Sequence, residues 1–341
     1  MMSKKKSIAI LVSFAMCSFS YLESVSANEY KVPKNDYGQP NIEGVWSNAT
    51  STKFERPTKF GKQLILSEEQ AAEQEGRAED YRAAGNVRTD PNQGAYTDGN
   101  TNAGYNRFWT DPGTRVMRVD GKPRSSMITF PENGRVPPRI SNAPDISKSV
   151  KDLDESSVGA GPSDGPESRG LSERCIFFNT SAGPVMRPTL YNNNYRIAQG
   201  KDAVVIVVEM SHDARVVRLN QKHNAIDLNE WMGDAIGYYE GNTLVVETIN
   251  YNSHQSFFNA SEKLKVTERF TRVAEDRLLY QFTVEDPLVW EKPWGGEYEF
   301  WDSKEQYEYA CHEGNLGMEG ILAGAREEER RHKESKNSTK E

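Results

Sequence analysis

The stretch Ala203–Leu219 reads AVVIVVEMSHDARVVRL and opens a series of short apolar runs that are separated by turn residues. Four further runs follow it: Ile236–Tyr239, Thr243–Tyr251, Leu264–Val273 and Leu278–Val284. Short runs rich in valine, isoleucine, threonine and aromatic residues are typical of β-strands, and connections this short leave no room for a crossover helix. The sequence therefore predicts a mainly β fold, an antiparallel meander that forms a barrel or a sandwich with peripheral helices.

Other elements are expected before the meander. Gly44–Trp46 resembles the short Gly-x-Trp stretch that opens the first strand of lipocalin-type barrels, which favours a lipocalin-like barrel, and a lone core tryptophan is the alternative. The segment Leu66–Ala84 predicts a surface helix, because Ser67 can cap it and its apolar positions are mostly alanine. Strands are expected at Arg115–Val119 and Ser125–Phe130.

The composition of the chain changes along its length and suggests four segments. A basic start at Lys4–Lys6, an apolar run Ile8–Phe19 and small residues before Asn28 predict a secretory signal peptide that is cleaved after Ala27. The protein is therefore expected to be periplasmic or secreted. The predicted segments are the signal peptide 1–27, the N-terminal strands, helix and long loops 28–170, the β-meander core 171–326 and a charged tail 327–341.

Charge and motif content argue against several classes of function. The formal net charge is -8 and no basic stripe is present, so nucleic-acid binding has little support. No segment after the signal peptide is apolar enough to cross a bilayer. The glycine-rich signatures of nucleotide sites and the His and Cys spacings of metal sites are missing, so neither a cofactor nor a metal is expected. The expected partner is a small-molecule ligand or substrate.

The predicted mature chain keeps two cysteines, Cys175 and Cys311. Export places both in an oxidising compartment, where such a pair favours a disulfide over two buried free thiols. The bridge would hold His312 and Glu313, which directly follow Cys311, against the rim of the barrel.

Three residues are candidates for acid–base catalysis: His212, Asp234 and His312. Histidine titrates near neutral pH, as a general acid or base requires, and both histidines lie next to strand patterns. If Ala203–Leu219 is one regular strand, alternation places His212 on the apolar face, where a core histidine is the competing interpretation. A bulge near Ser211 would change that assignment.

Five residues are candidates for ligand binding: Tyr105, Trp109, Arg215, Trp231 and Glu313. The first two belong to the aromatic stretch YNRFWTD, which interrupts a polar loop rich in Asn and Gly. Its rings can anchor the loop to the core, or they can line a ligand cleft, because aromatic side chains stack on flat ligands.

Six short motifs along the chain together carry a resemblance to a known family. They are YNNNY at Tyr191–Tyr195, EMSHDAR at Glu209–Arg215, WMGD at Trp231–Asp234, GYYEGNTLVVET at Gly237–Thr248, ERFTR at Glu268–Arg272 and YEYACHEGN at Tyr307–Asn315. With these motifs the chain resembles a large family of exported bacterial proteins that are usually labelled only as hypothetical. The resemblance covers most of Tyr105–Arg326 and implies export, but it carries no activity. Many relatives have a Ser and an Asp where this chain has Ala235 and Asn242.

Two classes of function follow from the sequence. In the first, the protein is a hydrolase or lyase that acts on a small sugar-like or aromatic compound through His212, Asp234 and His312. In the second, it is a non-catalytic binder of a small amphipathic ligand, with Trp109 and Trp231 lining a barrel pocket. Catalytic candidates gathered around one cavity would favour the enzyme, and a dry apolar cavity would favour the binder.

Overall fold

The computed structural model describes most of the chain after the predicted signal peptide. The described residues are 30–87, 92, 110–145, 163–170, 173–174, 176, 183, 185–225, 228–252, 254, 257–309 and 317–338. Every element below belongs to the compact unit Val32–Glu341. Among the residues singled out from the sequence, six lie outside the described parts, as does the signal peptide: Tyr105, Trp109, Cys175, Cys311, His312 and Glu313.

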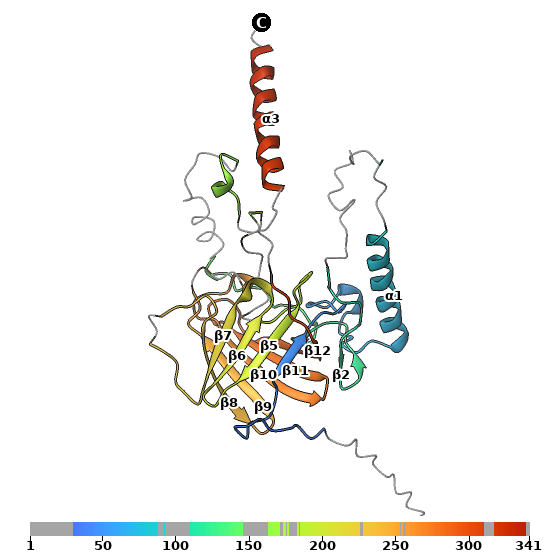
Figure 1. The fold of residues 1–341 in the computed structure, drawn as a ribbon, viewed down its shortest axis with the longest axis vertical. Coiled ribbons are helices and arrows are strands. Elements are labelled where there is room, and N and C mark those ends of the chain that lie inside the picture. The colour runs from blue at the N-terminus through green and yellow to red at the C-terminus, as the bar shows by residue number, and fades with distance from the viewer. Residues whose placement is uncertain are drawn as a thin grey trace, which may run out of the picture. The chain divides into compact units, whose positions relative to one another are not determined.

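Nine strands close into a barrel (Figure 1). In barrel order they are β1 (Gly44–Ser47), β5 (Asn194–Gln199), β6 (Ala203–Val208), β7 (Ala214–Leu219), β8 (Asp234–Glu240), β9 (Thr243–Ile249), β10 (Lys265–Ala274), β11 (Arg277–Glu285) and β12 (Trp294–Asp302). Strand β1 closes the ring because it pairs with β5 along one edge and with β12 along the other. The mainly β fold is thereby confirmed, and of the two predicted architectures the structure is the barrel.

One strand pair departs from the predicted antiparallel meander. Strands β7 and β8 run parallel, with Arg218 opposite Ile236 and Leu219 opposite Gly237. The segment between them, residues 220–233, is long enough to carry the chain back to the end of the barrel where β7 began. A parallel pair requires such a return, whereas the other neighbours in the barrel pair antiparallel.

The stretch Ala203–Leu219 is a pair of strands rather than one. Strand β6 ends at Val208, a 3-10 turn at Met210–His212 reverses the chain, and β7 starts at Ala214. The buried carboxylate of Glu209 fixes this reversal by accepting hydrogen bonds from the backbone N–H groups of Asn194 and Tyr307. The alternation expected for one strand therefore placed His212 wrongly: it lies in the turn and is exposed.

The elements outside the barrel are short strands and helices. Two α-helices lie within the described residues, α1 (Glu68–Gly85) and α3 (Gly317–Ser338), so the predicted charged tail continues a helix through Ser338. Helix α1 starts with the expected Ser67 cap, which forms a capping box with Gln70. The remaining elements are β2 (Arg118–Val119), β3 (Lys122–Pro123), β4 (Ile128–Phe130) and 3-10 turns at Thr58–Phe60, Pro166–Ser168, Met210–His212 and Phe257–Asn259.

Aromatic side chains fill the interior of the barrel. Along β11, Leu278, Tyr280, Phe282 and Val284 are buried in strict alternation, as a strand with one core face requires. The ring of Tyr280 lies 5.0–6.0 Å from four other rings, measured between centroids, on β10, β11 and β12. The interior is thus a packed core, and the polar groups inside it are few and specifically placed.

Within the part of the chain that the structure describes, no helix has the length and apolar character of a membrane span.

Candidate functional site

His212 is held by the segment that leads toward His312. Its Nε2 atom accepts a hydrogen bond from the backbone N–H of Tyr309, at 3.1 Å, and its ring lies edge-on to that of Tyr309. Because Nε2 is the acceptor, the proton of the neutral ring resides on Nδ1. His212 has φ of 57°, a backbone conformation that is uncommon for a residue with a side chain.

Asp234 lies at the start of β8 and is only 4% exposed. Its carboxylate accepts hydrogen bonds from the backbone N–H of Asn224, at 2.6 Å, and from Arg218 Nη2, at 2.6 Å, and it contacts His223 Nδ1 at 3.1 Å. Burial alone would raise its pKa, but these three contacts outweigh it and lower the pKa of Asp234. The carboxylate thereby ties the 220–233 connection to β7 and β8. No hydrogen bond or ion pair joins it to His212 among the described residues.

Replacing Asp234 by Asn is expected to lower the free energy of unfolding at pH 7 by about 1–3 kcal/mol, because three donors lose a charged acceptor. The pKa of Asp234 is lower in the folded protein than in the unfolded chain, where it is about 3.9. Its contribution is therefore fully present above that value and is lost as the pH falls through the lower, folded-state pKa. Urea unfolding of the wild-type protein and of Asp234→Asn should give free energies of unfolding whose difference narrows below about pH 4. A difference that widens in acid would contradict this role of Asp234.

Two ligand-binding candidates lie in very different surroundings. Trp231 is 63% exposed on the 220–233 connection, outside the packed interior of the barrel. Arg215 points into the barrel from β7 and forms a two-pronged ion pair with Glu268 of β10, with Nη1 3.0 Å from Oε1 and Nη2 against Oε2. Their side chains are 1% and 0% exposed.

The ion pair crosses the barrel interior, because β8 and β9 separate β7 from β10 in the sheet. Burial alone disfavours the charge on Arg215, but the Glu268 carboxylate outweighs it and raises the pKa of Arg215. The hydroxyl of Tyr280 donates to Glu268 Oε1 at 2.8 Å. Burial, together with that carboxylate, raises the pKa of Tyr280 well above its ordinary value, so the hydroxyl remains a donor.

The backbone of Met186 extends this hydrogen-bond network through the barrel interior. Its N–H group donates to the hydroxyl of Tyr280 at 3.4 Å. Its carbonyl accepts hydrogen bonds from the hydroxyl of Tyr298 and from Asn48 Nδ2. The buried pair Val185–Met186 therefore enters the barrel interior and presents the next residue, Arg187, to a group of aromatic rings.

The Arg187 site consists of Arg187, Phe54, Phe257 and Phe258. The guanidinium carbon lies 5.4 Å, 5.8 Å and 5.0 Å from the ring centroids of Phe54, Phe257 and Phe258, respectively. No hydrogen bond or ion pair joins the guanidinium to another residue in the described ranges. Burial lowers the pKa of Arg187, and the nearby Tyr298 and Tyr195 only partly offset this effect.

The core holds the aromatic walls of the Arg187 site in place. Phe54 stacks on Phe258 and on Phe282, with centroids 5.9 Å and 5.8 Å apart, and Phe257 stacks on Trp294 at 6.0 Å. The 3-10 turn that carries Phe257 and Phe258 has a left-handed backbone at Phe258, with φ of 47°. Such a conformation is strained for a bulky residue, and strained positions cluster at ligand sites.

The chemistry of the Arg187 site suits an anion with an apolar body. A guanidinium offers five N–H donors in a planar fork that matches a carboxylate, whereas aromatic faces accept no strong hydrogen bonds. Among the described residues, no group of three His, Cys, Asp or Glu is placed to bind a metal.

Sequence reasoning missed most of this interior site. Glu268 pairs with Arg215, whereas Arg269, its neighbour in the sequence, pairs with Glu240 on the exposed face. The burial of Glu268 could have been predicted from the alternation along β10, because Val266, Glu268 and Phe270 share one face and that face is buried. Arg187 carried no such signal, because its three rings come from segments far away in the chain.

No protein-family model matches the chain, and a search of curated proteins finds no significant match.

Proposed function

We propose that this protein binds a small amphipathic anion, an aromatic carboxylate or a similar compound, at the Arg187 site. The observation that carries the proposal is a partly buried guanidinium that three phenylalanine rings surround and that no described residue neutralises. The predicted signal peptide would place this binding outside the cytoplasm.

The energetics of a buried charge support this proposal. Removing a charge from water is costly unless a partner and hydrogen bonds compensate for it. Cation–π contacts with the three rings contribute about 0.5–2 kcal/mol each, and they leave the N–H donors of Arg187 without a hydrogen-bond acceptor among the described residues. A ligand carboxylate would accept two of these hydrogen bonds, and its aromatic part would pack against Phe54 and Phe258, which are only partly buried.

The hydrolase or lyase interpretation has less support. Its candidates His212 and Asp234 have separate sets of hydrogen-bond partners, and the donors around Asp234 satisfy its carboxylate in a structural role. His212 does contact Tyr309, three positions before His312, but His312 lies outside the described residues. The geometry therefore favours a binding protein.

Binding of 2-naphthoate to the full chain, measured by calorimetry and by thermal shift, tests the proposal. The wild-type protein should bind 2-naphthoate more tightly than 2-naphthylmethanol, which lacks the charge, or acetate, which lacks the rings. Arg187→Met should weaken binding of 2-naphthoate about ten- to hundredfold, because a hydrogen bond to a charged group contributes about 1.5–3 kcal/mol. The melting temperature of the free protein should change little, because the loss of the cation–π contacts is offset by removal of a partly buried charge.

Arg272→Met is the matched control. The guanidinium of Arg272 also lies over an aromatic ring, that of Trp46 at 5.4 Å, but it donates a hydrogen bond to the carbonyl of Glu275. This variant should bind 2-naphthoate as the wild-type protein does. Equal binding by Arg187→Met, or no binding by the wild-type protein, would overturn the proposal.

A further inference from the structure

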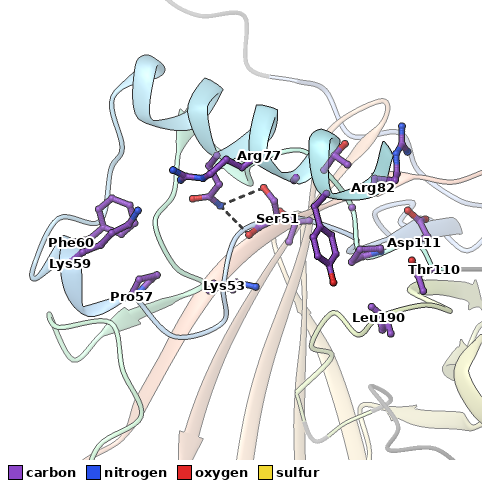
Figure 2. A pocket seen from close by; sticks show the side chains of 17 residues that line it. Ser51, Lys53, Pro57, Lys59, Phe60, Arg77, Arg82, Thr110, Asp111 and Leu190 are labelled. Atoms are coloured by element: carbon purple, nitrogen blue, oxygen red, sulfur yellow. Dashed lines mark hydrogen bonds between the residues drawn. The ribbon is translucent and has the colours of Figure 1, made fainter. Parts of the chain in front are cut away.

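A groove of about 600 Å³ lies between α1 and the segment Thr110–Thr114 (Figure 2). Its volume falls within the range of small-molecule sites, which is roughly 300–1,000 Å³. Ser51 and Lys53 line it below the helix, and Leu190 lines it near Thr110. The groove is therefore formed by segments far apart in the sequence, and none of the four residues of the Arg187 site lines it.

Contacts of α1 with the body of the protein make the groove a preformed feature. The side-chain amide of Gln74 donates to the carbonyl and to the hydroxyl of Ser51, at 3.0 Å and 3.4 Å, as the dashed lines in Figure 2 show. Glu75 Oε1 accepts from the backbone N–H of Val116 at 2.8 Å. Ala71, the buried residue of the helix, packs in a small apolar cluster with Leu66 and Val116.

The lining of the groove is strongly basic in an otherwise acidic protein. It includes four cations, Lys53, Lys59, Arg77 and Arg82, and one acidic residue, Asp111, although the whole chain carries a net charge of -8. The two arginines pair with Glu73 and Glu79 of the same helix, and all four of those side chains are at least half exposed. Such surface pairs contribute about 0.3–0.5 kcal/mol, so a ligand can displace them.

The two lysines differ from the arginines in their ion pairs. No ion pair joins Lys53 or Lys59 to an acidic residue within the described parts of the chain. Lys59 Nζ lies 4.8 Å from the centroid of the Phe60 ring, which also lines the groove. Both ammonium groups are therefore available to an anion.

The cations are spread along the groove rather than gathered at one point. Figure 2 shows Lys59 toward one end, Arg82 toward the other, and Lys53 and Arg77 between them. The ring of Tyr81, which is 60% exposed, lines the same groove and offers a flat apolar face. A row of charges beside an exposed ring matches an extended ligand whose repeating units carry both a negative charge and an apolar face.

We infer that this groove binds an acidic oligosaccharide, a chain of uronic acid units. Each carboxylate would meet one of the spaced cations, and a sugar ring would stack on Tyr81. A single phosphate would use only one or two of the cations. A short acidic oligomer needs to contact only the basic groove, whereas a long nucleic acid would extend onto the acidic remainder of the protein and be repelled there. The inference is independent of the Arg187 site.

Calorimetric titration of the full chain with a short oligogalacturonate at low salt tests the inference. The acidic oligomer should bind, and a neutral malto-oligosaccharide of equal length and inorganic phosphate should bind much more weakly. Replacing Lys53 and Lys59 together by Gln should weaken binding about tenfold, because two exposed ion pairs contribute about 1.4 kcal/mol in total. Tyr81→Ala should also weaken it.

The matched control replaces Lys201 and Lys222, two exposed lysines outside the groove, together by Gln. This double variant has the same net charge and should bind the oligomer as the wild-type protein does, as should Arg187→Met. Equal losses in both lysine double variants would show a general charge effect and would overturn the inference. Binding of phosphate or of the neutral oligomer as tight as that of oligogalacturonate, or no binding of the acidic oligomer, would also overturn it.

Discussion

Replacing Glu268 by Gln is expected to lower the free energy of unfolding by about 3–5 kcal/mol, a large part of the stability of an ordinary domain. The substitution keeps the shape of the side chain but leaves the guanidinium of Arg215 charged inside the barrel without its carboxylate. The hydroxyl of Tyr280 also loses a charged acceptor. Urea unfolding at pH 7, followed by circular dichroism and by tryptophan fluorescence, measures the loss.

An exposed pair of the same residue types provides the control. Arg269 Nη2 lies 2.9 Å from Glu240 Oε2, and both side chains are more than one third exposed. Glu240→Gln should therefore cost less than about 1 kcal/mol. The double variant Arg215→Met/Glu268→Leu should be more stable than Glu268→Gln, because it removes both buried charges. If Glu268→Gln lowers the free energy of unfolding as little as Glu240→Gln does, the buried ion pair is not important for stability.

A second large effect is expected at Gly296, where β12 pairs with both β11 and β4. A Cβ atom at this position would lie 2.0 Å from the carbonyl oxygen of Met127 and 2.8 Å from the Cα atom of Ile128. The register between β12 and β4 shifts between Gly295 and Gly296, so the two backbones approach closely at an irregular point of the sheet. Gly296→Ala must displace backbone, and we expect a loss of at least about 3 kcal/mol from overpacking and from the weakened hydrogen bond of Glu297 N–H to Met127.

Gly76→Ala is the matched glycine control. Gly76 lies inside α1, and a Cβ atom there would have no neighbour within 4 Å. Because alanine favours a helix over glycine, this variant should be about 0.5–1 kcal/mol more stable than the wild-type protein. Thermal unfolding of the two variants should therefore shift in opposite directions. A Gly296→Ala protein as stable as the wild-type protein would show that β12 and β4 separate without cost.

The sequence by itself determined those features that depend on neighbours in the chain. Short runs rich in β-branched and aromatic residues, separated by turn residues, predicted most strands of the barrel, because such side chains favour a β-strand over a helix. The capping residue Ser67 and the mostly alanine apolar positions of Leu66–Ala84 predicted a surface helix, which the structure has at Glu68–Gly85. Turn residues at Glu240–Asn242 and at Ala274–Arg277 marked the hairpins β8–β9 and β10–β11.

Only the tertiary structure decided the reversal at His212, the parallel pair β7–β8 and the partners of the interior charges. Arg215 and Glu268 are separated by 53 positions in the sequence, whereas Arg269 directly follows Glu268 and faces the other side of β10. Closure of the barrel determines which arginine pairs with Glu268. Inward-facing residues of distant strands meet across the interior, whereas outward-facing residues cannot. The Arg187 site arises for the same reason: Phe54, Arg187 and Phe257 come from three distant segments, and no local pattern records that they meet.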